Sequence, residues 1–449
     1  MQNKTAIPSK TFKVLFNELL SWSLIYALFV RCGVRRRRPP EITQVELIQG
    51  LVFHVVAEAG TLAQHVKQLT GKQVTDGALA QRRALLPPEL FDQLMRAALK
   101  PKADPRRHPE AFYKGLRLCG VDGSLFSVTN TPQVKRQMRK ARSRRGRAAF
   151  PKVGAVVMVE LGLHNPLAAA VGEHGQSEYA LTRDLIGALP QSCLLLADRL
   201  CGVPVLIAEI YAACRGRSSH FLIRTRHNLL VQKRRRLRDG SALVEVGVRD
   251  PKHRKKVTEV LQLREIQVRI SRPGHRGEVL RLWTSLLDPQ AAPALELVRL
   301  YAQRWEQELY WRQMKLELRK TALLQSHTPL TAAQEIVMLI LATALLAHER
   351  ARAADGKRPV LQISFVKCLA LLRPLWLTLS LAGNVLSPAV QSALCRVFDR
   401  EIQRCLKSKR RARSCLRAVR QPIKGWPRML RPAYANGNWR YQIIRTTRP

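Results

Sequence analysis

The sequence predicts an α/β fold: a mixed-sheet core with an inserted antiparallel β subdomain, a helical N-terminal domain and a helical C-terminal region. Residues 41–100 have helical spacing, within a predicted N-terminal DNA-binding domain of residues 1–100, and residues 110–228 alternate short apolar runs with helical stretches. Residues 229–289 return to strand patterning, residues 290–350 resume a helical pattern, and residues 351–449 are helical and basic. These ranges are the predicted domains. Residues 110–228 and 290–350 are the two parts of the core, because strand–helix alternation is typical of a mixed α/β sheet.

Two short helices around a glycine turn stand out in the N-terminal domain. Thr61–Leu69 reads as one helix that breaks at Gly71, and Thr75 caps a second helix carrying Arg82 and Arg83. This arrangement fits a helix-turn-helix DNA-binding unit, and it fits an ordinary helical hairpin equally well. A further helix over Glu89–Leu99 and a Pro-rich linker at Pro101–Pro109 complete the region.

The core strands are short apolar runs rich in β-branched or small residues. The predicted strands are Leu116–Val121, Val153–Leu161, Leu167–Val171, Cys193–Ala197 and His220–Arg224. The predicted helices between them are Ser177–Leu189 and Val203–Cys214. The β subdomain then follows as the runs ALVEVGV, VLQLREIQVRI and EVLRLWTSLLD, separated by Gly and Pro turn residues.

The charge balance points to a polyanionic partner. The chain has 449 residues, and 77 Lys and Arg against 32 Asp and Glu leave a formal charge of +45. Hydrophobic residues make up 46 % of the chain, which excludes a disordered basic tail. Double-stranded DNA is therefore the first partner to consider.

Cysteine usage and apolar runs suggest a cytoplasmic protein with no membrane segment. The nine cysteines are scattered without a CxxC pair, which argues against a structural zinc site and a disulfide framework. The apolar stretches Leu19–Val30, Ile336–Ala347 and Leu369–Leu381 fall short of the roughly 18–20 residues that a membrane span needs. We expect buried helices. Association of the first stretch with a membrane surface stays open as an alternative, because Arg35–Arg38 follow it.

Two aspartates follow buried runs of the predicted sheet. Asp122 ends the run Leu116–Val121, and Asp198 ends Cys193–Ala197. A buried carboxylate without a partner is costly, and a shared Mg²⁺ would relieve that cost. The alternative is that Asp122 forms a turn with Gly123 and that Asp198 caps the next helix.

A third acid lies on the helix predicted from Tyr301 to Lys315. At about 100° per residue, one arc of roughly 60° holds an aromatic residue, two cations and one acid. These residues are Tyr301, Arg304, Glu308 and Lys315. Glu306 lies away from this face, so Glu308 is the candidate. The alternative is a salt-bridged helix face with Arg304 and Glu308 at i,i+4.

These residues carry a resemblance to a known family. Tyr301–x2–Arg304–x3–Glu308–x6–Lys315 resembles the Y-R-E-K signature of DDE transposases of the insertion-sequence-four family. Asp122 in VDGS and Asp198 in LLLADR resemble the two catalytic aspartates of that family. The segment QSHTP and the helix after it resemble the family's continuation, so the resemblance covers roughly residues 75–350.

The resemblance implies a ribonuclease H-like core and a transposase activity. Asp122, Asp198 and Glu308 would hold two Mg²⁺ ions, for which Mn²⁺ can substitute, and would cut and rejoin DNA at the terminal inverted repeats of an insertion sequence. It also implies a homodimer on paired transposon ends. The expected location is the bacterial cytoplasm, in association with the nucleoid.

The resemblance further implies DNA contacts. Tyr301, Arg304 and Lys315 would grip phosphates, and Trp283 would stack on a flipped base. The alternative for Trp283 is an ordinary inward-facing strand aromatic, because a shift of one residue in register reverses its face.

Basic stretches outside the signature are further DNA candidates. The segment Lys135–Arg147 is predicted as a basic loop beside the active site, or alternatively as a solvated mobile loop. Its DNA-binding candidates are Lys135, Arg136, Arg139 and Lys140. The basic end Lys407–Arg431, which includes Trp426, could contact transposon ends or a second protomer.

Three other functions remain open at this stage. One is an inactive or domesticated DNA-binding descendant, and another is a ribonuclease H-like nuclease that cuts DNA without joining a 3′ end to a target. The third is a structural nucleic-acid packager, in which Asp198→Asn would leave function intact.

Overall fold

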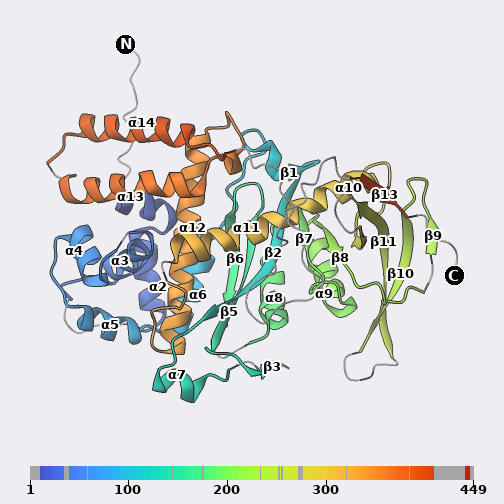
Figure 1. The fold of residues 1–449 in the computed structure, drawn as a ribbon, viewed down its shortest axis with the longest axis horizontal. Coiled ribbons are helices and arrows are strands. Elements are labelled where there is room, and N and C mark those ends of the chain that lie inside the picture. The colour runs from blue at the N-terminus through green and yellow to red at the C-terminus, as the bar shows by residue number, and fades with distance from the viewer. Residues whose placement is uncertain are drawn as a thin grey trace, which may run out of the picture. The chain divides into compact units, whose positions relative to one another are not determined.

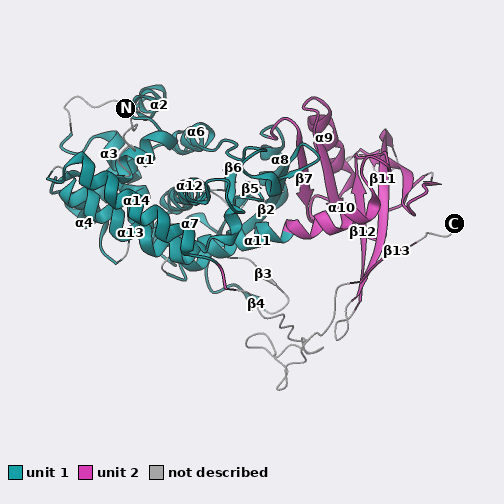
Figure 2. Ribbon diagram, turned by 90° about the horizontal axis from the view of Figure 1, so that it is seen from above, with its two compact units in different colours: residues 1–188, 305–406 teal, residues 189–304, 407–449 magenta. Residues whose placement is uncertain are grey.

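The computed structural model confirms the predicted fold class, a mixed α/β sheet with an antiparallel β subdomain and helices in both terminal regions (Figure 1). It describes residues 11–34, 40–57, 59–140, 142–143, 146–172, 176–232, 234–250, 253, 256–271, 277–319, 321–383, 385–408 and 440–444. The chain divides into two compact units, coloured separately in Figure 2. Unit 1 contains residues 1–188 and 305–406, and unit 2 contains residues 189–304 and 407–449.

The N-terminal part of unit 1 is helical, as predicted. Its helices are α1 (Phe12–Leu19), α2 (Trp22–Arg31), α3 (Gln44–Val56), α4 (Leu62–Thr70), α5 (Asp76–Ala84) and α6 (Pro88–Ala98). Thr61 caps α4 through a reciprocal capping box with Gln64, and Gly71 ends it at a φ of 74°, which favours glycine. Thr75 caps α5 by accepting the N–H of Ala78. The sequence placed these boundaries because capping residues are local signals.

The segment after α6 is held against the core. The buried carboxylate of Glu160 accepts hydrogen bonds from the backbone N–H groups of Lys102 (2.9 Å) and Ala103 (3.0 Å). It also pairs with Arg117 and accepts from Asn165 Nδ2 at 2.6 Å. The predicted linker at residues 101–109 is therefore fixed by a buried acid, and it leads into the short 3₁₀ helix η1 (Pro109–Ala111).

Four strands of unit 1 form an antiparallel group. They are β1 (Phe112–Tyr113), β2 (Leu116–Ser127), β5 (Lys152–Glu160) and β6 (Asn165–Val171), with β2 pairing both β1 and β5, and β5 pairing β6. Helix α8 (Glu178–Ile186) packs on them. Strand β2 continues past Asp122, which lies opposite Val157, so the predicted strand end at Val121 is wrong, and so is the alternative of a turn at Asp122-Gly123. The pairing partner in β5, which lies far along the chain, extends the strand through Gly123.

Apart from a hairpin of two short strands, the remaining elements of unit 1 share the core with the N-terminal helices. They are α7 (Pro132–Gln137), β3 (Arg142–Ser143), β4 (Gly146–Arg147), α11 (Trp305–Arg312), the π-helical segment η3 (Gln313–Leu318), α12 (Pro329–Ala354), η4 (Val360–Gln362), α13 (Phe365–Ala382) and α14 (Pro388–Arg404). Helix α12 packs on α3, α6 and β6, and α13 packs on α4. Residues predicted as separate N-terminal, core and C-terminal domains therefore build one hydrophobic core.

Unit 2 combines a parallel strand pair with the β subdomain. Strand β7 (Cys193–Ala197) and strand β8 (His220–Arg224) are parallel and joined by α9 (Pro204–Arg215). The antiparallel strands that follow are β9 (Arg234–Arg236), β10 (Ala242–Arg249), β11 (Val257–Ser271) and β12 (Glu278–Thr284), in the order β8-β12-β11-β10-β9. Helix α10 (Ala294–Tyr301) and the 3₁₀ turn η2 (Ala302–Arg304) end this stretch.

The far C-terminus contributes a strand to unit 2. Strand β13 (Arg440–Ile443) pairs antiparallel with β11, from Val268↔Ile443 to Ser271↔Arg440. The sequence predicted a helical end here. The strand was missed because its pairing partner, β11, lies far along the chain. The basic cluster from Lys407 onward lies mostly outside the described residues, as do Trp426 and Arg35–Arg38.

The length criterion for membrane spans was wrong for two helices. By length and composition α12 and α13 could each cross a membrane, and α1 with α2, bent by 56°, would make a third if they formed one span. The apolar windows in the sequence were shorter because charged and polar residues flank them, but the helices continue through those residues. In α12, 89 % of the most apolar window is buried in the protein, compared with 39 % in α13. The core of unit 1 accounts for the apolar character of α12.

Candidate catalytic site

Asp122 lies half-buried in the middle of β2, on the face that packs against α11. Side chains alternate along a strand, so Gly120 and Asp122 share a face. A Cβ atom on Gly120 would lie 2.9 Å from Oε1 of Gln307, which shows how closely α11 approaches this face. Gln307 immediately precedes Glu308. Within unit 1 the fold therefore brings together the two elements that carry Asp122 and Glu308.

The residues next to Glu308 bind the sheet of unit 1. Glu306 Oε2 lies 2.8 Å from Nε2 of the buried His164. The side-chain amide of Gln307 donates to the carbonyl oxygen of Val157 at 3.0 Å. Glu306 is thus bound to His164. This agrees with the prediction that Glu306 lies away from the helix face that carries Glu308. Glu308 itself is half-buried.

Lys315 approaches Asp122 from the π-helical segment. Its Nζ donates to the carbonyl oxygen of Leu125 at 2.8 Å and lies 4.8 Å from the ring centroid of Phe126. Burial lowers the pKa of Lys315 to about 8, and the positive charges of Arg319 and Lys152 act in the same direction, while Asp122 opposes them. The ammonium group is therefore within electrostatic reach of the carboxylate.

The signature is not one regular α-helix. Tyr301 ends α10, residues 302–304 form a 3₁₀ turn, and residues 313–318 are π-helical. A 3₁₀ turn advances about 120° per residue and a π-helix less than an α-helix, so the arc predicted from 100° per residue does not hold. The boundary between the two units also falls inside the signature, between Arg304 and Trp305.

Asp198 lies in unit 2, directly after β7. One carboxylate oxygen accepts the N–H of Leu200 at 2.7 Å, which closes a short turn. The buried Tyr301 hydroxyl donates to the carbonyl oxygen of Ala197 at 3.2 Å, and burial raises its pKa. The Tyr301 side chain is only 7 % exposed, so it supports the end of β7 from inside the protein.

A small basic pocket surrounds Asp198. It is lined by Asp198, Arg199, Arg224, Tyr301 and Arg304. Arg199 and Arg224 were not among the residues predicted from the sequence. Ala197 of β7 lies opposite Ile223 of β8 in the parallel pair. Asp198 and Arg224 are the next residues in the sequence, so both lie at the carboxyl ends of these two strands. The ends of adjacent parallel strands were the signal that could have found Arg224.

Glu178 was missed beside Asp122. Its Oε1 accepts the N–H of Gly123 at 3.1 Å, and a Cβ atom on Gly123 would lie only 2.4 Å from the Glu178 side chain. Glu178 is the first residue of α8, where an acid is favourable. Glycine at position 123 is therefore needed for this close approach.

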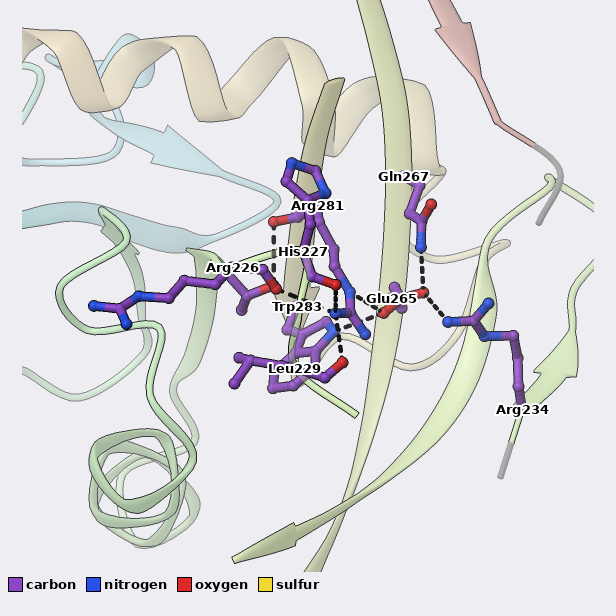
Figure 3. A network of polar contacts seen from close by, with 9 residues as sticks. Arg226, His227, Leu229, Arg234, Glu265, Gln267, Arg281 and Trp283 are labelled. Carbon is purple, nitrogen blue, oxygen red and sulfur yellow. Dashed lines mark hydrogen bonds and ion pairs between the residues drawn. The ribbon is translucent and has the colours of Figure 1, made fainter. Parts of the chain in front are cut away.

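Trp283 is fully buried, so the expectation that it stacks on a flipped base is wrong for this structure. The ring is 0 % exposed in β12, and its Nε1–H donates to Oε2 of Glu265 at 2.9 Å. Figure 3 shows Glu265 also bound by Arg234 (2.7 Å), Arg281 (2.6 Å) and Gln267 (2.9 Å). The guanidinium of Arg281 lies 5.1 Å from the Trp283 ring centroid. Trp283 is the inward-facing strand aromatic of the alternative reading, because the register turns it into the core.

Arg83 is occupied inside unit 1. Its guanidinium donates to Oε1 of Gln334 (3.0 Å), to Oγ of Ser326 (3.1 Å) and to the carbonyl oxygen of Thr331. These bonds tie α5 to the start of α12, which accounts for Arg83 without DNA. Arg82 lies on the same helix and is half-buried.

The basic segment after β2 is partly helical. Thr131 caps α7, and the buried side chains of Val134 and Met138 anchor it. Lys135, Arg136 and Arg139 are exposed, and Lys140 is half-buried. Thr131 Oγ1 donates to the carbonyl oxygen of His327 at 2.6 Å, so α7 is attached to the segment after the signature. The predicted loop is therefore wrong for residues 135–137, which belong to α7.

Within the described ranges, no group of three or more His, Cys, Asp or Glu side chains is close enough to form a metal site. Asp122 and Glu308 belong to unit 1 and Asp198 to unit 2.

Comparison with known proteins identifies the family. Residues 114–345 match the family model described as the transposase DDE domain, and this range contains Asp122, Asp198 and Glu308. The chain belongs to the transposase DDE domain family. The resemblance to insertion-sequence-four transposases is confirmed by a relative from that group.

Two relatives come from Escherichia coli (strain K12). The chain is 29 % identical over 248 residues to "Transposase InsG for insertion sequence element IS4", covering 55 % of each chain. It is 27 % identical over 95 residues to "Putative transposase InsZ", covering 21 % of this chain and 32 % of that one. The matches thus span about half and about one third of these relatives.

A solved structure is also similar. It is the cryo-EM structure of the piggyBac transposase synaptic complex with hairpin DNA, with a TM-score of 0.42 and 11 % identity, covering 90 % of this chain and 87 % of that one. A likeness at this level carries no functional conclusion for this DDE chain.

Proposed function

We propose that this DDE-family chain is a transposase that binds the terminal inverted repeats of its own element, cuts the DNA and joins the freed 3′ ends to a target. The observation that carries the proposal is the family match over residues 114–345, with Asp122 and Glu308 on elements that pack together. The basic pocket around Asp198 supports it, because arginines beside a carboxylate suit a phosphate group near a metal ligand.

The proposed cofactor is a pair of Mg²⁺ ions, with Mn²⁺ as a substitute. Asp122, Asp198 and Glu308 would hold them, and the donor chemistry fits because Mg²⁺ prefers carboxylate oxygens. A bound metal of this kind supplies Lewis-acid stabilisation of a phosphodiester.

The chain's own cations would hold the DNA backbone at the site. Lys315, whose Nζ already lies near Asp122, would neutralise a phosphate beside it, and Arg304 would do the same in the pocket of Asp198. Tyr301 would act indirectly, because its hydroxyl holds the carbonyl oxygen that precedes Asp198. Arg82 and the exposed residues of α7 would contact the duplex farther away.

Partner and location follow from the same proposal. The substrate is double-stranded DNA, at transposon ends and at the target, and a homodimer would bring two ends together. The protein would act in the bacterial cytoplasm, in association with the nucleoid.

The proposal is tested by replacing each acid with its amide. The variants Asp122→Asn, Asp198→Asn and Glu308→Gln should each lose metal-dependent cleavage by more than about 100-fold, because even outer-shell partners of metal sites typically contribute 10–100-fold. Binding of duplex DNA should survive. The substrate is a plasmid carrying the DNA that flanks the coding sequence, with Glu317→Gln from the neighbouring π-helical segment as the control.

The outcomes separate the competing functions. Retained cleavage in any one acid variant removes that residue from the catalytic set. Nicking by the wild type without joining of a 3′ end to a target supports a nuclease. DNA binding without any cleavage in Mg²⁺ or Mn²⁺ supports an inactive descendant.

A further inference from the structure

One buried histidine contacts two residues that flank Glu308 in the sequence, one in α11 and one in the π-helical segment after it. His164 lies in the turn between β5 and β6 and is 2 % exposed. Its Nε2 is 2.8 Å from Glu306 Oε2, and its Nδ1 is 2.9 Å from Gln313 Oε1. A histidine ring carries nitrogens on two sides, so a single side chain can engage both partners.

The two partners lie on one face of the helix, opposite Glu308. Glu306 and Gln313 are seven residues apart, which is close to two full turns, whereas Glu308 is about 200° around from Glu306. Gln313 is also the first residue of the π-helical segment. His164 therefore contacts the face opposite Glu308 at two points. One is the first turn of α11, and the other is the residue where the α-helix becomes π-helical.

The turn that presents His164 is itself fixed. The backbone N–H of His164 bonds to the carbonyl oxygen of Glu160 at 2.9 Å, and the residue has a φ of 56°. Positive φ is uncommon for residues other than glycine, with Asn, Asp and His enriched there. The carboxylate of Glu160 is held in turn by backbone N–H groups and Arg117. The ring thus projects from a rigid base.

We propose that His164 is a positioning residue that sets the location and orientation of Glu308 through Glu306 and Gln313. It touches neither substrate nor metal in this role. The inference rests on the proposed function, because it assigns Glu308 a catalytic task. Its physical basis is that a shift of about 1 Å in a catalytic group can reduce rate about 100-fold.

The primary test is His164→Asn, which tolerates positive φ but is too short to bridge both partners. Hydrogen exchange is measured on peptides covering residues 305–318 and on peptides from α12. Faster exchange confined to residues 305–318 is expected, because the helix loses both contacts. The matched control is His108→Asn, since His108 is also buried but its Nδ1 accepts the backbone N–H of the nearby Asp104 at 3.0 Å.

The catalytic readout separates positioning from general destabilisation. In the plasmid assay with MgCl₂, His164→Asn should lower kcat about 10–100-fold, with KM for DNA changed less than about twofold. Glu306→Gln and Gln313→Leu leave the turn intact and should each cause a smaller loss. The double variant His164→Asn/Glu306→Gln should be no worse than His164→Asn alone, because both act through one contact.

Two results would overturn the proposal. One is unchanged exchange of residues 305–318 in His164→Asn, and the other is a loss of kcat no larger than that of His108→Asn. If wild-type protein cleaves no DNA, the proposed function fails, and the exchange experiment still decides whether His164 holds the helix.

Discussion

Lys315 is a cation held in surroundings that disfavour its charge. Burial lowers its pKa from 10.5 to about 8, helped by Arg319 and Lys152 and opposed by Asp122. Between pH 8 and pH 10.5 the unfolded chain therefore binds this proton more than the folded chain does. The free energy of unfolding should rise with pH in that window, and the cost of the charge is fully present below pH 8.

This behaviour predicts the effect of Lys315→Met. In EDTA and without DNA, the variant should lack the part of the pH-dependent rise that Lys315 supplies and should be more stable than wild type at pH 7. Urea unfolding at pH 7.5, 8.5 and 9.5 measures both effects, with the exposed Lys135→Met as control. Identical pH dependence in wild type and Lys315→Met would contradict the prediction.

Glu265 holds two arginines and an indole N–H inside unit 2 (Figure 3). Glu265→Gln would leave Arg281 and Arg234 without their counter-charge, and breaking a buried pair typically costs about 3–5 kcal/mol. Chemical denaturation should show a loss of this size, whereas Glu259→Gln, an exposed site on the same strand, should stay within about 0.5 kcal/mol. A loss below about 1 kcal/mol would mean that the network contributes little.

At the scale of elements, α7 is a short helix that is anchored by buried apolar residues and whose basic residues are exposed. Val134 and Met138 fix the helix, and Lys135, Arg136 and Arg139 face solvent. Replacing all three with Gln should weaken binding of a random duplex and reduce the salt slope of log K by up to about 2.7, at roughly 0.9 per phosphate contact. The control is Arg396→Gln/Arg400→Gln/Arg404→Gln on α14, and equal effects in both triples would indicate diffuse charge instead of a DNA-binding helix.

At the scale of the whole molecule, unit 1 is built from two separate stretches of the sequence, residues 1–188 and 305–406. Helix α12 buries its apolar residues against α3, α6 and β6, so the helical N-terminal region completes the core. A fragment containing residues 110–449 should therefore fail to fold as a soluble monomer, because α12 would lose two of its covering helices. Circular dichroism and thermal unfolding of the purified fragment check this, and a cooperative transition like that of the full chain would contradict it.

Much of the fold could be predicted because its signals are local. The strands Cys193–Ala197 and His220–Arg224 were predicted with the bounds that the structure has, and the cap at Thr75 was located from residue type alone. For the candidate site, the sequence could predict which residues belong to it but not how they are arranged. Spacing along the helix singled out Glu308 in preference to Glu306. The end of β2 was not predictable, because pairing with β5 carries the strand past Asp122.

The sequence by itself indicated the family, singled out the three acids as candidates and predicted most of the strands and helices, because motif spacing and hydrophobic period are written along the chain. The tertiary structure decided which face each side chain takes and what it contacts. It buried Trp283 against Glu265, joined Arg83 to Gln334 in α12 and bonded His164 to Glu306, behind Glu308. These contacts join residues 18, 251 and 142 positions apart. The physical reason is that strand register and long-range packing depend on distant residues, which local patterns do not specify.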